Sequence, residues 1–291
     1  MADLHINNGW NFKWTDKEDN IIRKYYPKNG ANAVHEILKN RELRSIQQRA
    51  FKLGIKYLQY DKEYFDKIDT IEKAYWLGFL YADGYVTSDN RWGVELCYED
   101  YNHLQKLLYA FNYNGDLKTR ERNGTKSCSF LINNKHMTDS LISNGVIPNK
   151  TYCLEFPNEN IIPKKLYSHF IRGFFDGDGC VYITQNAKPR KDRGNKIYTR
   201  ICKGINFVCK SENFINDLLH ILNDNGINFH SSINKRDNLY TITTSSLNEI
   251  EKFYNYIYKN SNPNIRLERK FNKFNEIFNA TTNSDVSAKI S

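Results

Sequence analysis

The sequence predicts an α+β protein made of two pseudo-symmetric repeats, preceded by a small all-α domain of three helices. Three observations lead to this prediction. Two apolar helical runs, residues 74–86 and 169–183, end in the same pattern of a small residue, Asp and Gly. Each run is followed by a similar order of strand and helix signals. The first 58 residues contain short helical segments instead.

Composition narrows the class of protein. The chain has 291 residues, of which 40% are apolar and 14% aromatic, enough to bury the cores of two or three domains. Its net charge of +9 favours a polyanionic partner. Because it has no apolar run of 18 residues and no signal-peptide pattern, we expect no membrane partner and no secretion. The expected location is cytoplasmic, in a bacterial or phage-encoded setting, or organellar. Six cysteines without a CxxC pair indicate neither a zinc site nor a disulfide framework.

The N-terminal segment has clear helix boundaries. Thr15 and Glu18 have the spacing of a capping box, which predicts the start of a helix. Pro27 and Gly30 are expected to break it. A second helix is predicted over about residues 31–39, and a third over about 43–53 with Gly54 as its C-cap.

These three helices resemble a Myb-like helix-turn-helix module, which we assign to residues 1–58. Residues 1–60 hold eleven Lys or Arg against six Asp or Glu, which suits DNA. A three-helix module that docks a protein is the alternative. If the segment binds DNA, its third helix offers polar side chains for reading bases. These are Ser45, Gln47, Gln48, Arg49 and Lys52.

Residues 59–70 have no strong periodicity and are interpreted as a linker. The first repeat, residues 71–160, continues after its apolar helix with a hairpin turning at residues 88–90. A helix over 100–112, a second hairpin about Asn123 and Gly124, and a helix over 136–144 follow.

The second repeat, residues 161–279, predicts the same order. Its first hairpin joins residues 181–186 to 197–208 through a basic loop, and a helix follows over 212–223. A hairpin turning at 236–238 and a helix over 246–259 complete the unit. Both repeats therefore read αββαββα. A last helix is predicted over about 267–278, and the Ser/Thr/Asn-rich tail, residues 280–291, is expected to be disordered.

Basic residues cluster on the predicted strands and hairpin loops. Lys118, Arg120 and Arg122 recur at every second position, so one strand face would carry all three charges. Such crowding destabilises a sheet unless an anion offsets it. We expect the basic residues of both repeats to contact DNA. They are Arg91, Lys118, Arg120, Arg122, Lys188, Arg190, Lys191, Arg193, Lys196, Arg200, Lys235 and Arg236.

The two apolar helices place carboxylates where a helix disfavours them. Asp83 and Asp178 fall in the last turn, near the negative end of the helix dipole, and Gly84 and Gly179 suit the left-handed position beyond it. Small residues four apart, Gly78 with Ala82 and Gly173 with Gly177, would let the two helices approach closely. The aspartates would then lie side by side, and with backbone carbonyls they form an oxygen-rich site suited to Mg²⁺.

The sequences WLGFLYADG (76–84) and IRGFFDGDG (171–179) resemble the two signature helices of a single-chain LAGLIDADG homing endonuclease. The first departs from the pattern, with Trp76 for the opening Leu and Tyr81 for the first Asp. This departure bears on local capping more than on metal binding, since the first Asp is not the family's ligand. The resemblance covers both repeats.

The resemblance implies a saddle of two sheets that binds double-stranded DNA, and site-specific hydrolysis of both strands. Asp83 and Asp178, with the carbonyls of Ala82 and Gly177, would hold Mg²⁺, for which Mn²⁺ would substitute. Lys150 would lie near one scissile phosphate. Lys270 would lie near the other, with Arg269 or Lys273 as alternatives. Lys210 matches a polar position near the metals.

In the first repeat the counterpart of Lys210 is Tyr98, which suggests unequal cleavage of the two strands. Two other functions fit the same fold. One is an RNA maturase that assists intron splicing, with RNA as its partner. The other is a non-catalytic DNA-binding transcription regulator. Because both aspartates are present, the nuclease is favoured, and we expect a monomer.

Overall fold

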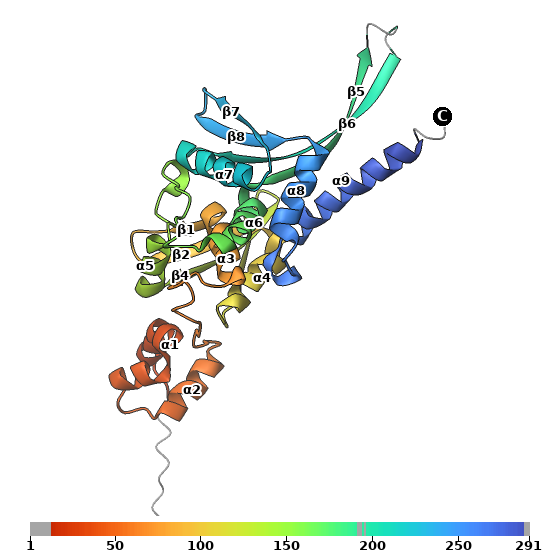
Figure 1. The fold of residues 1–291 in the computed structure, drawn as a ribbon. Coiled ribbons are helices and arrows are strands. Elements are labelled where there is room, and N and C mark those ends of the chain that lie inside the picture. Colours follow the sequence, from red (N-terminus) through yellow and green to blue (C-terminus); the bar gives the residue numbers. More distant parts are fainter. Residues whose placement is uncertain (1–12, 191–193, 195, 288–291) are drawn as a thin grey trace, which may run out of the picture. The chain divides into compact units, whose positions relative to one another are not determined.

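The structure is a computed structural model that describes residues 13–190, 194 and 196–287 (Figure 1). Its internal contacts divide the chain into two compact units. The N-terminal unit comprises the described residues up to Tyr60 together with Asn112–Gly115. The two-repeat unit comprises Asp61–Phe111 and the described residues from Asp116 onward.

The N-terminal unit contains helices α1 (Asp16–Ile37) and α2 (Leu43–Lys52). The capping box predicted at Thr15 and Glu18 is confirmed, since each side chain bonds the backbone N–H of the other. Gly30, with φ 72°, interrupts α1, whereas Pro27 lies within it and does not end it. Gly54 follows α2 with φ 68°, as the predicted left-handed C-cap requires.

The core of this unit is apolar, and two ion pairs lie at its edge. Ile22, Val34, Ile46 and Ala50 are fully buried and pack in one cluster, with Trp14, Tyr25 and Leu53 against it. Two ion pairs brace α1. Arg41 donates to Glu18 at 2.7 Å, and Arg49 of α2 donates to Asp19 at 2.8 and 2.6 Å.

The two-repeat unit contains two repeats with the predicted element order. The first has α3 (Ile71–Ala82), β1 (Gly84–Val86), β2 (Arg91–Cys97), α4 (Tyr101–Ala110), β3 (Lys118–Arg122), β4 (Thr125–Asn133) and α5 (Lys135–Ser143). The second has α6 (Tyr167–Asp178), β5 (Cys180–Arg190), β6 (Lys196–Cys209), α7 (Glu212–Asp224), β7 (His230–Asn234), β8 (Leu239–Thr244) and α8 (Leu247–Tyr258). Helix α9 (Glu268–Ser287) follows.

Each repeat forms an antiparallel four-stranded sheet with the same topology. The strand order is β1-β2-β4-β3 in the first and β5-β6-β8-β7 in the second. Asn123 and Gly124, both with positive φ, form the β3–β4 turn, and Asn238 does so between β7 and β8. These turns lie where the sequence predicts them.

Helices α3 and α6 cross at two glycines and lie side by side at the centre of the unit (Figure 1). A Cβ added at Gly78 would overlap the carbonyl oxygen of Phe170, and one added at Gly173 would overlap that of Tyr75. The backbones therefore touch at these positions, as the spacing of small residues predicts. Most of the other α3 and α6 residues at this crossing are buried aromatics and aliphatics.

Three local predictions differ from the structure. Gly84 and Gly179 have no positive φ, and Gly179 is extended at φ −71°. Glycine is required there by space instead, because a Cβ would meet the Leu80 carbonyl or the Phe175 ring. The basic loop is largely strand, since β5 reaches Arg190 and β6 begins at Lys196.

The tail is the third difference. Helix α9 continues to Ser287, so the segment 280–287 is helical where the sequence favours disorder. No Gly or Pro interrupts residues 268–287, and buried Phe274 and Ile277 anchor the preceding turns. Residues 288–291 lie outside the described residues.

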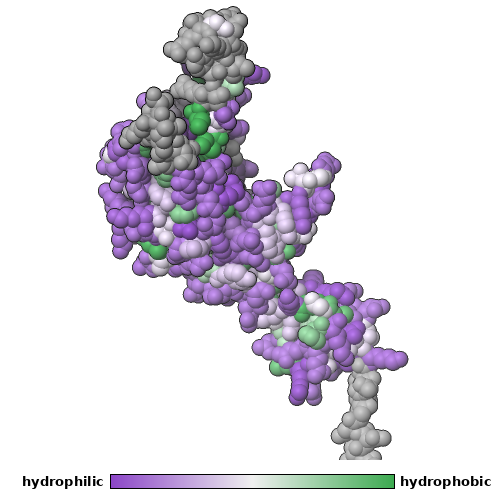
Figure 2. Space-filling model, turned by 90° about the vertical axis from the view of Figure 1, so that its right-hand side faces the viewer, coloured by the Kyte–Doolittle hydropathy of each residue, from purple (hydrophilic) through white to green (hydrophobic). Residues whose placement is uncertain are grey.

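The described surface is mostly polar. In the view of Figure 2, hydrophilic residues cover most of it and hydrophobic residues form small patches, one of them on the helical N-terminal unit. Among the described residues, no helix combines the length and apolarity needed to cross a bilayer.

Candidate active site and metal centre

The two signature aspartates meet at the C-terminal ends of α3 and α6. Asp83 caps α3, and Asp178 is the last residue of α6. A Cβ added at Gly177 would lie 2.9 Å from Asp83 Oδ2 and would overlap the Ala82 Cβ. The Asp83 carboxylate thus lies against the residue that precedes Asp178. The absence of a side chain at Gly177 makes this approach possible.

Both carboxyl groups are electrostatically strained. Burial raises the pKa of Asp83 to about 6, and the nearby Asp178 adds to the shift, while Lys270 and Lys150 oppose it. Burial also raises the pKa of Asp178, against the same two lysines. Although the Asp178 side chain is exposed, the surrounding protein displaces enough water to raise the pKa of its carboxyl group. A site that holds two such anions together favours a bound cation.

Lys150 is brought to this centre by the segment after α5. Asn149 has a left-handed backbone, φ 55°, and begins the turn that carries Lys150. The Lys150 ammonium donates to the carbonyl of Leu80 at 2.9 Å and to that of Gly84. Burial lowers its pKa to about 8, against the attraction of Asp178 and Asp83.

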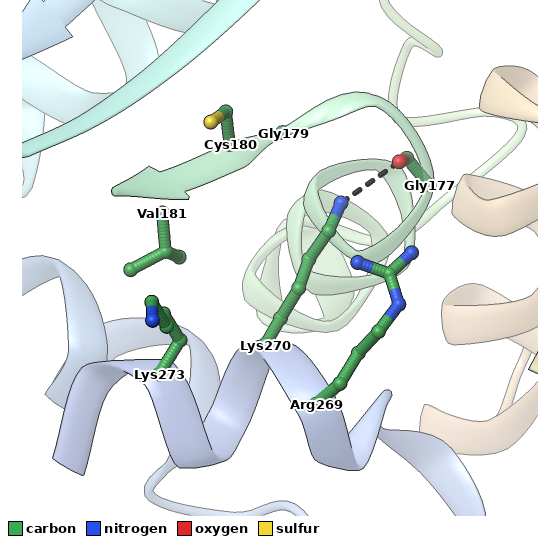
Figure 3. A pocket seen from close by; sticks show the side chains of 7 residues that line it. All are labelled: Gly177, Gly179, Cys180, Val181, Arg269, Lys270 and Lys273. Carbon is green, nitrogen blue, oxygen red and sulfur yellow. Dashed lines mark hydrogen bonds between the residues drawn. The ribbon is translucent and has the colours of Figure 1, made fainter. Parts of the chain in front are cut away.

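Lys270 makes similar contacts in the second repeat. From the first turn of α9 it donates to the carbonyl of Phe175 at 2.7 Å. It also donates to the carbonyl of Gly177 at 2.8 Å (Figure 3). It is 7% exposed, and burial lowers its pKa to about 8. Each lysine therefore caps the end of its own repeat's signature helix. Lys270 also occupies one lone pair of the Gly177 carbonyl, which the resemblance assigns to a metal.

Two cavities flank the carboxylates. One, of about 410 Å³, places three cations of α9 opposite the start of β5 (Figure 3). Its lining residues are Gly177, Gly179, Cys180, Val181, Arg269, Lys270 and Lys273. The other, of about 170 Å³, includes Ala82, Lys150, Asp178 and Lys210. Of the five candidate catalytic residues, Lys270 lines the larger cavity, Lys150, Asp178 and Lys210 line the smaller one, and Asp83 lines neither.

The structure distinguishes Lys270 from its neighbours on α9. Arg269 forms a two-bond ion pair with Asp100, both bonds at 2.8 Å. Lys273 pairs with Glu276 at 2.6 Å on the solvent side. Only Lys270 reaches the signature helix among the three residues that the sequence offers. Asp100 belongs to the first repeat, so Arg269 ties the two repeats together.

The polar position beyond each second strand is also occupied differently in the two repeats. Lys210 lies 3.2 Å from the hydroxyl of Tyr152 and 4.9 Å from the centre of its ring. In the first repeat Tyr98 stands at the corresponding place, and the Lys126 ammonium lies 3.6 Å from its ring centre. A lysine and a tyrosine therefore lie together at both places, but the partner comes from β4 beside Tyr98 and from the segment after α5 beside Lys210.

The donor set fits a hard divalent ion. Among the described residues, no three His, Cys, Asp or Glu side chains gather as a metal cluster. Mg²⁺ needs fewer protein ligands, since it is held by one or two carboxylates with water and substrate phosphates. Asp83 and Asp178, with the carbonyls of Ala82 and Gly177, supply oxygen donors alone. These four groups would hold the ion.

The predicted DNA-contacting residues spread over several surfaces. Lys118, Arg120 and Arg122 are exposed, but so is every residue of β3, so the expected contrast between its faces is absent. Arg91 pairs with Asp89 at 2.7 Å. Lys235 and Arg236 are exposed at the β7–β8 turn.

The long hairpin carries the other predicted contacts of the second repeat. Its Cα register pairs Arg190 with Lys196 and Asn186 with Arg200, and Lys188 lies on β5. Lys191 and Arg193 lie outside the described residues. On α2, Gln47, Gln48 and Lys52 are exposed and Ser45 is half-buried, whereas Arg49 is held by Asp19.

Comparison with known proteins identifies both repeats. The LAGLIDADG-like domain family matches residues 165–258, and the WhiA LAGLIDADG-like domain family matches residues 72–132. Each repeat of the two-repeat unit therefore contains a segment that matches a LAGLIDADG-like domain family. The matched segments contain α6 and all of α3 except Ile71, and so both aspartates. A search of curated proteins gave no match.

Solved structures share the LAGLIDADG fold. The I-LtrWI LAGLIDADG homing endonuclease bound to target DNA aligns with a TM-score of 0.51 at 13% identity, over 77% of this chain and 92% of that one. The LAGLIDADG homing endonuclease I-GzeII in complex with its DNA target gives 0.48 at 13% identity, over 75% and 92%. At this identity the likeness concerns the fold.

Proposed function

We propose that the chain is a site-specific endonuclease that hydrolyses both strands of double-stranded DNA with Mg²⁺ held by Asp83 and Asp178. The observation that carries the proposal is the meeting of these two carboxylates, each beside a lysine, at the end of the α3–α6 pair. The structures that share this fold are homing endonucleases with DNA. The LAGLIDADG domains would form the DNA-binding saddle.

The bound ion would activate water and neutralise charge on a phosphodiester. The chain's own residues have distinct tasks. Asp83 and Asp178 place two negative charges close together, and bound cations would offset the repulsion between them. Lys150 and Lys270, whose pKa values near 8 keep most of each population protonated at neutral pH, place one positive charge on either side. Each offsets charge that develops on a scissile phosphate. Lys210 adds a third cation on the Lys150 side.

The two sides are chemically unequal, which supports unequal cleavage of the two strands. Lys270 shares its cavity with Arg269 and Lys273, whereas Lys150 shares its cavity with Lys210 and is followed by the exposed Tyr152. DNA contacts would come from β3, from the β5–β6 and β7–β8 hairpins, and from α2 in a helix-turn-helix module.

The test is cleavage of a randomised plasmid library by the full chain with Mg²⁺, followed by sequencing of the ends. We expect staggered breaks at one long site. Asp83→Asn or Asp178→Asn should abolish cleavage of that site and preserve binding to it within about threefold, roughly 0.7 kcal/mol. Asp139→Asn, a change at an exposed aspartate paired with Lys135, is the control and should cut normally. Full cleavage by either signature variant would exclude the assigned roles.

A non-catalytic DNA-binding regulator is the second candidate, favoured by one observation. The first repeat matches the WhiA LAGLIDADG-like domain family rather than the family that matches the second repeat. A regulator would bind one DNA site with the same affinity in Mg²⁺ or EDTA and leave it intact. The library experiment distinguishes the two functions, because bound but uncut DNA can be recovered from the same mixture. An RNA maturase would instead bind folded intron RNA in preference to duplex DNA.

A further inference from the structure

Phe51 on α2 leaves its side chain almost entirely in water. It is 85% exposed, the largest fraction among the exposed large hydrophobic side chains of the described residues. Burying such a ring is worth about 1.5–3 kcal/mol. The helix is thus folded with an apolar group presented outward, beside the buried Ile46 and Ala50 that face the core.

Phe51 belongs to a stripe of exposed side chains along α2. Residues three and four apart on a helix share a face, and the outward face collects five such residues. They are Arg44, Gln47, Gln48, Phe51 and Lys52. None of the five side chains takes part in a hydrogen bond or ion pair within the part of the chain that the structure describes. We call this the α2 stripe.

The chemistry of the α2 stripe suits nucleic acid. Helix α2 contains no Asp or Glu, so its ends carry Arg44 and Lys52 without an acid on the helix to neutralise them. Arg49, the remaining cation, is fixed by Asp19 and holds α2 against α1. Between the cations lie two amides and one ring. A glutamine amide matches the N6 and N7 edge of adenine, and a phenyl ring matches the C5-methyl group of thymine.

The spacing within the stripe agrees with that of stacked bases. Phe51 lies four residues after Gln47 and three after Gln48, which is about 4.5–6 Å along the helix axis. Base pairs in a duplex are separated by about 3.4 Å. A ring one turn beyond the amides would therefore meet the next base pair or the one after it.

We propose that α2 enters the major groove at A·T base pairs, where Gln47 or Gln48 bonds adenine and Phe51 packs against the methyl group of thymine. Arg44 and Lys52 would bind the flanking phosphates. The proposal rests on the proposed function only in requiring that the full chain bind duplex DNA. It does not require cleavage. It adds a base preference and a specificity-determining residue that basic charge alone does not supply.

The experiment removes the methyl group from the DNA and the ring from the protein. A duplex that binds the full chain is first selected from a random library. Footprinting with the full chain and with a chain that lacks residues 1–57 then locates the base pairs that the N-terminal unit covers. Each thymine in that region is then replaced by deoxyuridine, which lacks only the C5-methyl group. We expect about three- to tenfold weaker binding by the wild-type chain at one or two positions.

Phe51→Ala should bind the thymine duplex about as weakly as the wild-type chain binds the deoxyuridine duplex. It should also lose its sensitivity to that replacement. Tyr109→Ala is the matched control, because Tyr109 is an aromatic residue 69% exposed on α4. It should keep wild-type affinity and the full response to deoxyuridine. Since the Phe51 side chain is exposed, the variant should fold, which circular dichroism checks.

Three results would overturn the proposal. They are equal wild-type affinity for both duplexes, a Phe51→Ala variant that still responds to the methyl group, and a variant that binds all DNA normally but loses a protein partner. Failure of the proposed function looks different. A chain that cuts no DNA but shows the coupled loss would refute the endonuclease and support the base reading. A chain that cuts DNA without the coupled loss would do the reverse.

Discussion

The corresponding residues Tyr81 and Asp176 perform the same task with different chemistry. The Tyr81 hydroxyl donates to the carbonyl of Asn144 at 2.7 Å, in the segment that leads to Lys150. Asp176 accepts from the backbone N–H of Leu267 at 2.7 Å, in the segment that leads to Lys270. Each side chain therefore ties its signature helix to the chain that delivers a lysine. The sequence marks the departure at residue 81, but not this role, since both partners are backbone atoms far along the chain.

Asp176 is the more consequential of the two. It is fully buried and also accepts from the hydroxyls of Tyr75 and Tyr258, each at 2.8 Å. We predict that Asp176→Leu lowers the free energy of unfolding by about 3–5 kcal/mol, because three buried donors lose their acceptor. Asp176→Asn, which keeps one acceptor oxygen for Leu267, should cost less than half as much. Urea unfolding measures both. Equal losses in the two variants would contradict the assignment of the cost to the lost hydrogen bonds.

Glu18 gives the N-terminal unit a defined acid sensitivity. The hydrogen bond from Arg41 lowers the pKa of Glu18 to about 2, and backbone and side-chain bonds from Thr15 contribute, while burial opposes them. A lowered carboxyl pKa stabilises the fold above the unfolded value of about 4.5 and loses this effect as pH falls towards 2.

Glu18→Gln should therefore destabilise the N-terminal unit by about 1–3 kcal/mol at pH 7, a range that allows for solvent screening near the surface. The difference from the wild-type chain should shrink between pH 4.5 and pH 2. Hydrogen–deuterium exchange of peptides from residues 16–52 in the full chain measures this. Glu36→Gln, a change at an exposed residue of α1, is the control. A constant difference at every pH would contradict the assigned pKa.

At the scale of elements, the crossing of α3 and α6 decides the geometry of the site. Three features could be predicted, because each depends on local spacing. They are the order of helices and strands, the two hairpins with Asn turns, and this glycine-lined crossing. The conformations at Gly84 and Gly179 could not be predicted. Their need for glycine comes from a carbonyl and a ring four residues earlier in the chain, which a C-cap pattern does not distinguish from a left-handed turn.

The crossing should tolerate no added methyl group. We predict that Gly173→Ala lowers the free energy of unfolding by about 3 kcal/mol or more, since the methyl group would overlap the Tyr75 carbonyl within a rigid helix. Gly226→Ala is the control. Its Cβ meets no atom within 4 Å, so only the φ of 72° opposes it, at about 1–2 kcal/mol. Thermal unfolding compares them, and a smaller loss for Gly173→Ala would contradict the close approach.

At the scale of the whole molecule, charge is shared between two units. We predict that removing residues 1–57 weakens DNA binding without ending cleavage. The salt dependence of binding should also become shallower, because the truncated chain neutralises fewer phosphates. We expect the slope of log K against log salt to decrease in magnitude by about two to four. Binding titrations between 50 and 300 mM salt measure it. If the truncated chain kept both affinity and slope, the N-terminal unit would have no part in holding DNA.

The limits of prediction at this scale are also physical. The two αββαββα repeats and the pairing of Asp83 with Asp178 follow from patterns repeated within the chain. The bond from Lys270 to Gly177 and the ion pair from Arg269 to Asp100 do not, because neither has a counterpart in local spacing. The polar side of the third predicted helix suggested Arg49 as a base reader, but in the structure its guanidinium pairs with Asp19. The sequence alone does not distinguish one exposed charged residue from another. The difference appears only when the structure shows which residues lie beside each.

The ion pair between Arg269 and Asp100 has a consequence for how the protein is made. Asp100 emerges from the ribosome long before Arg269. Its carboxylate gains this ion-pair partner only after 169 further residues have been synthesised. Lys270 is synthesised directly after Arg269. The lysine at the end of α6 and the ion pair between the two repeats therefore become available together. A nascent chain stalled before residue 267 would carry Asp83 and Asp178 but neither Arg269 nor Lys270, so the centre of the proposed function would be incomplete in it.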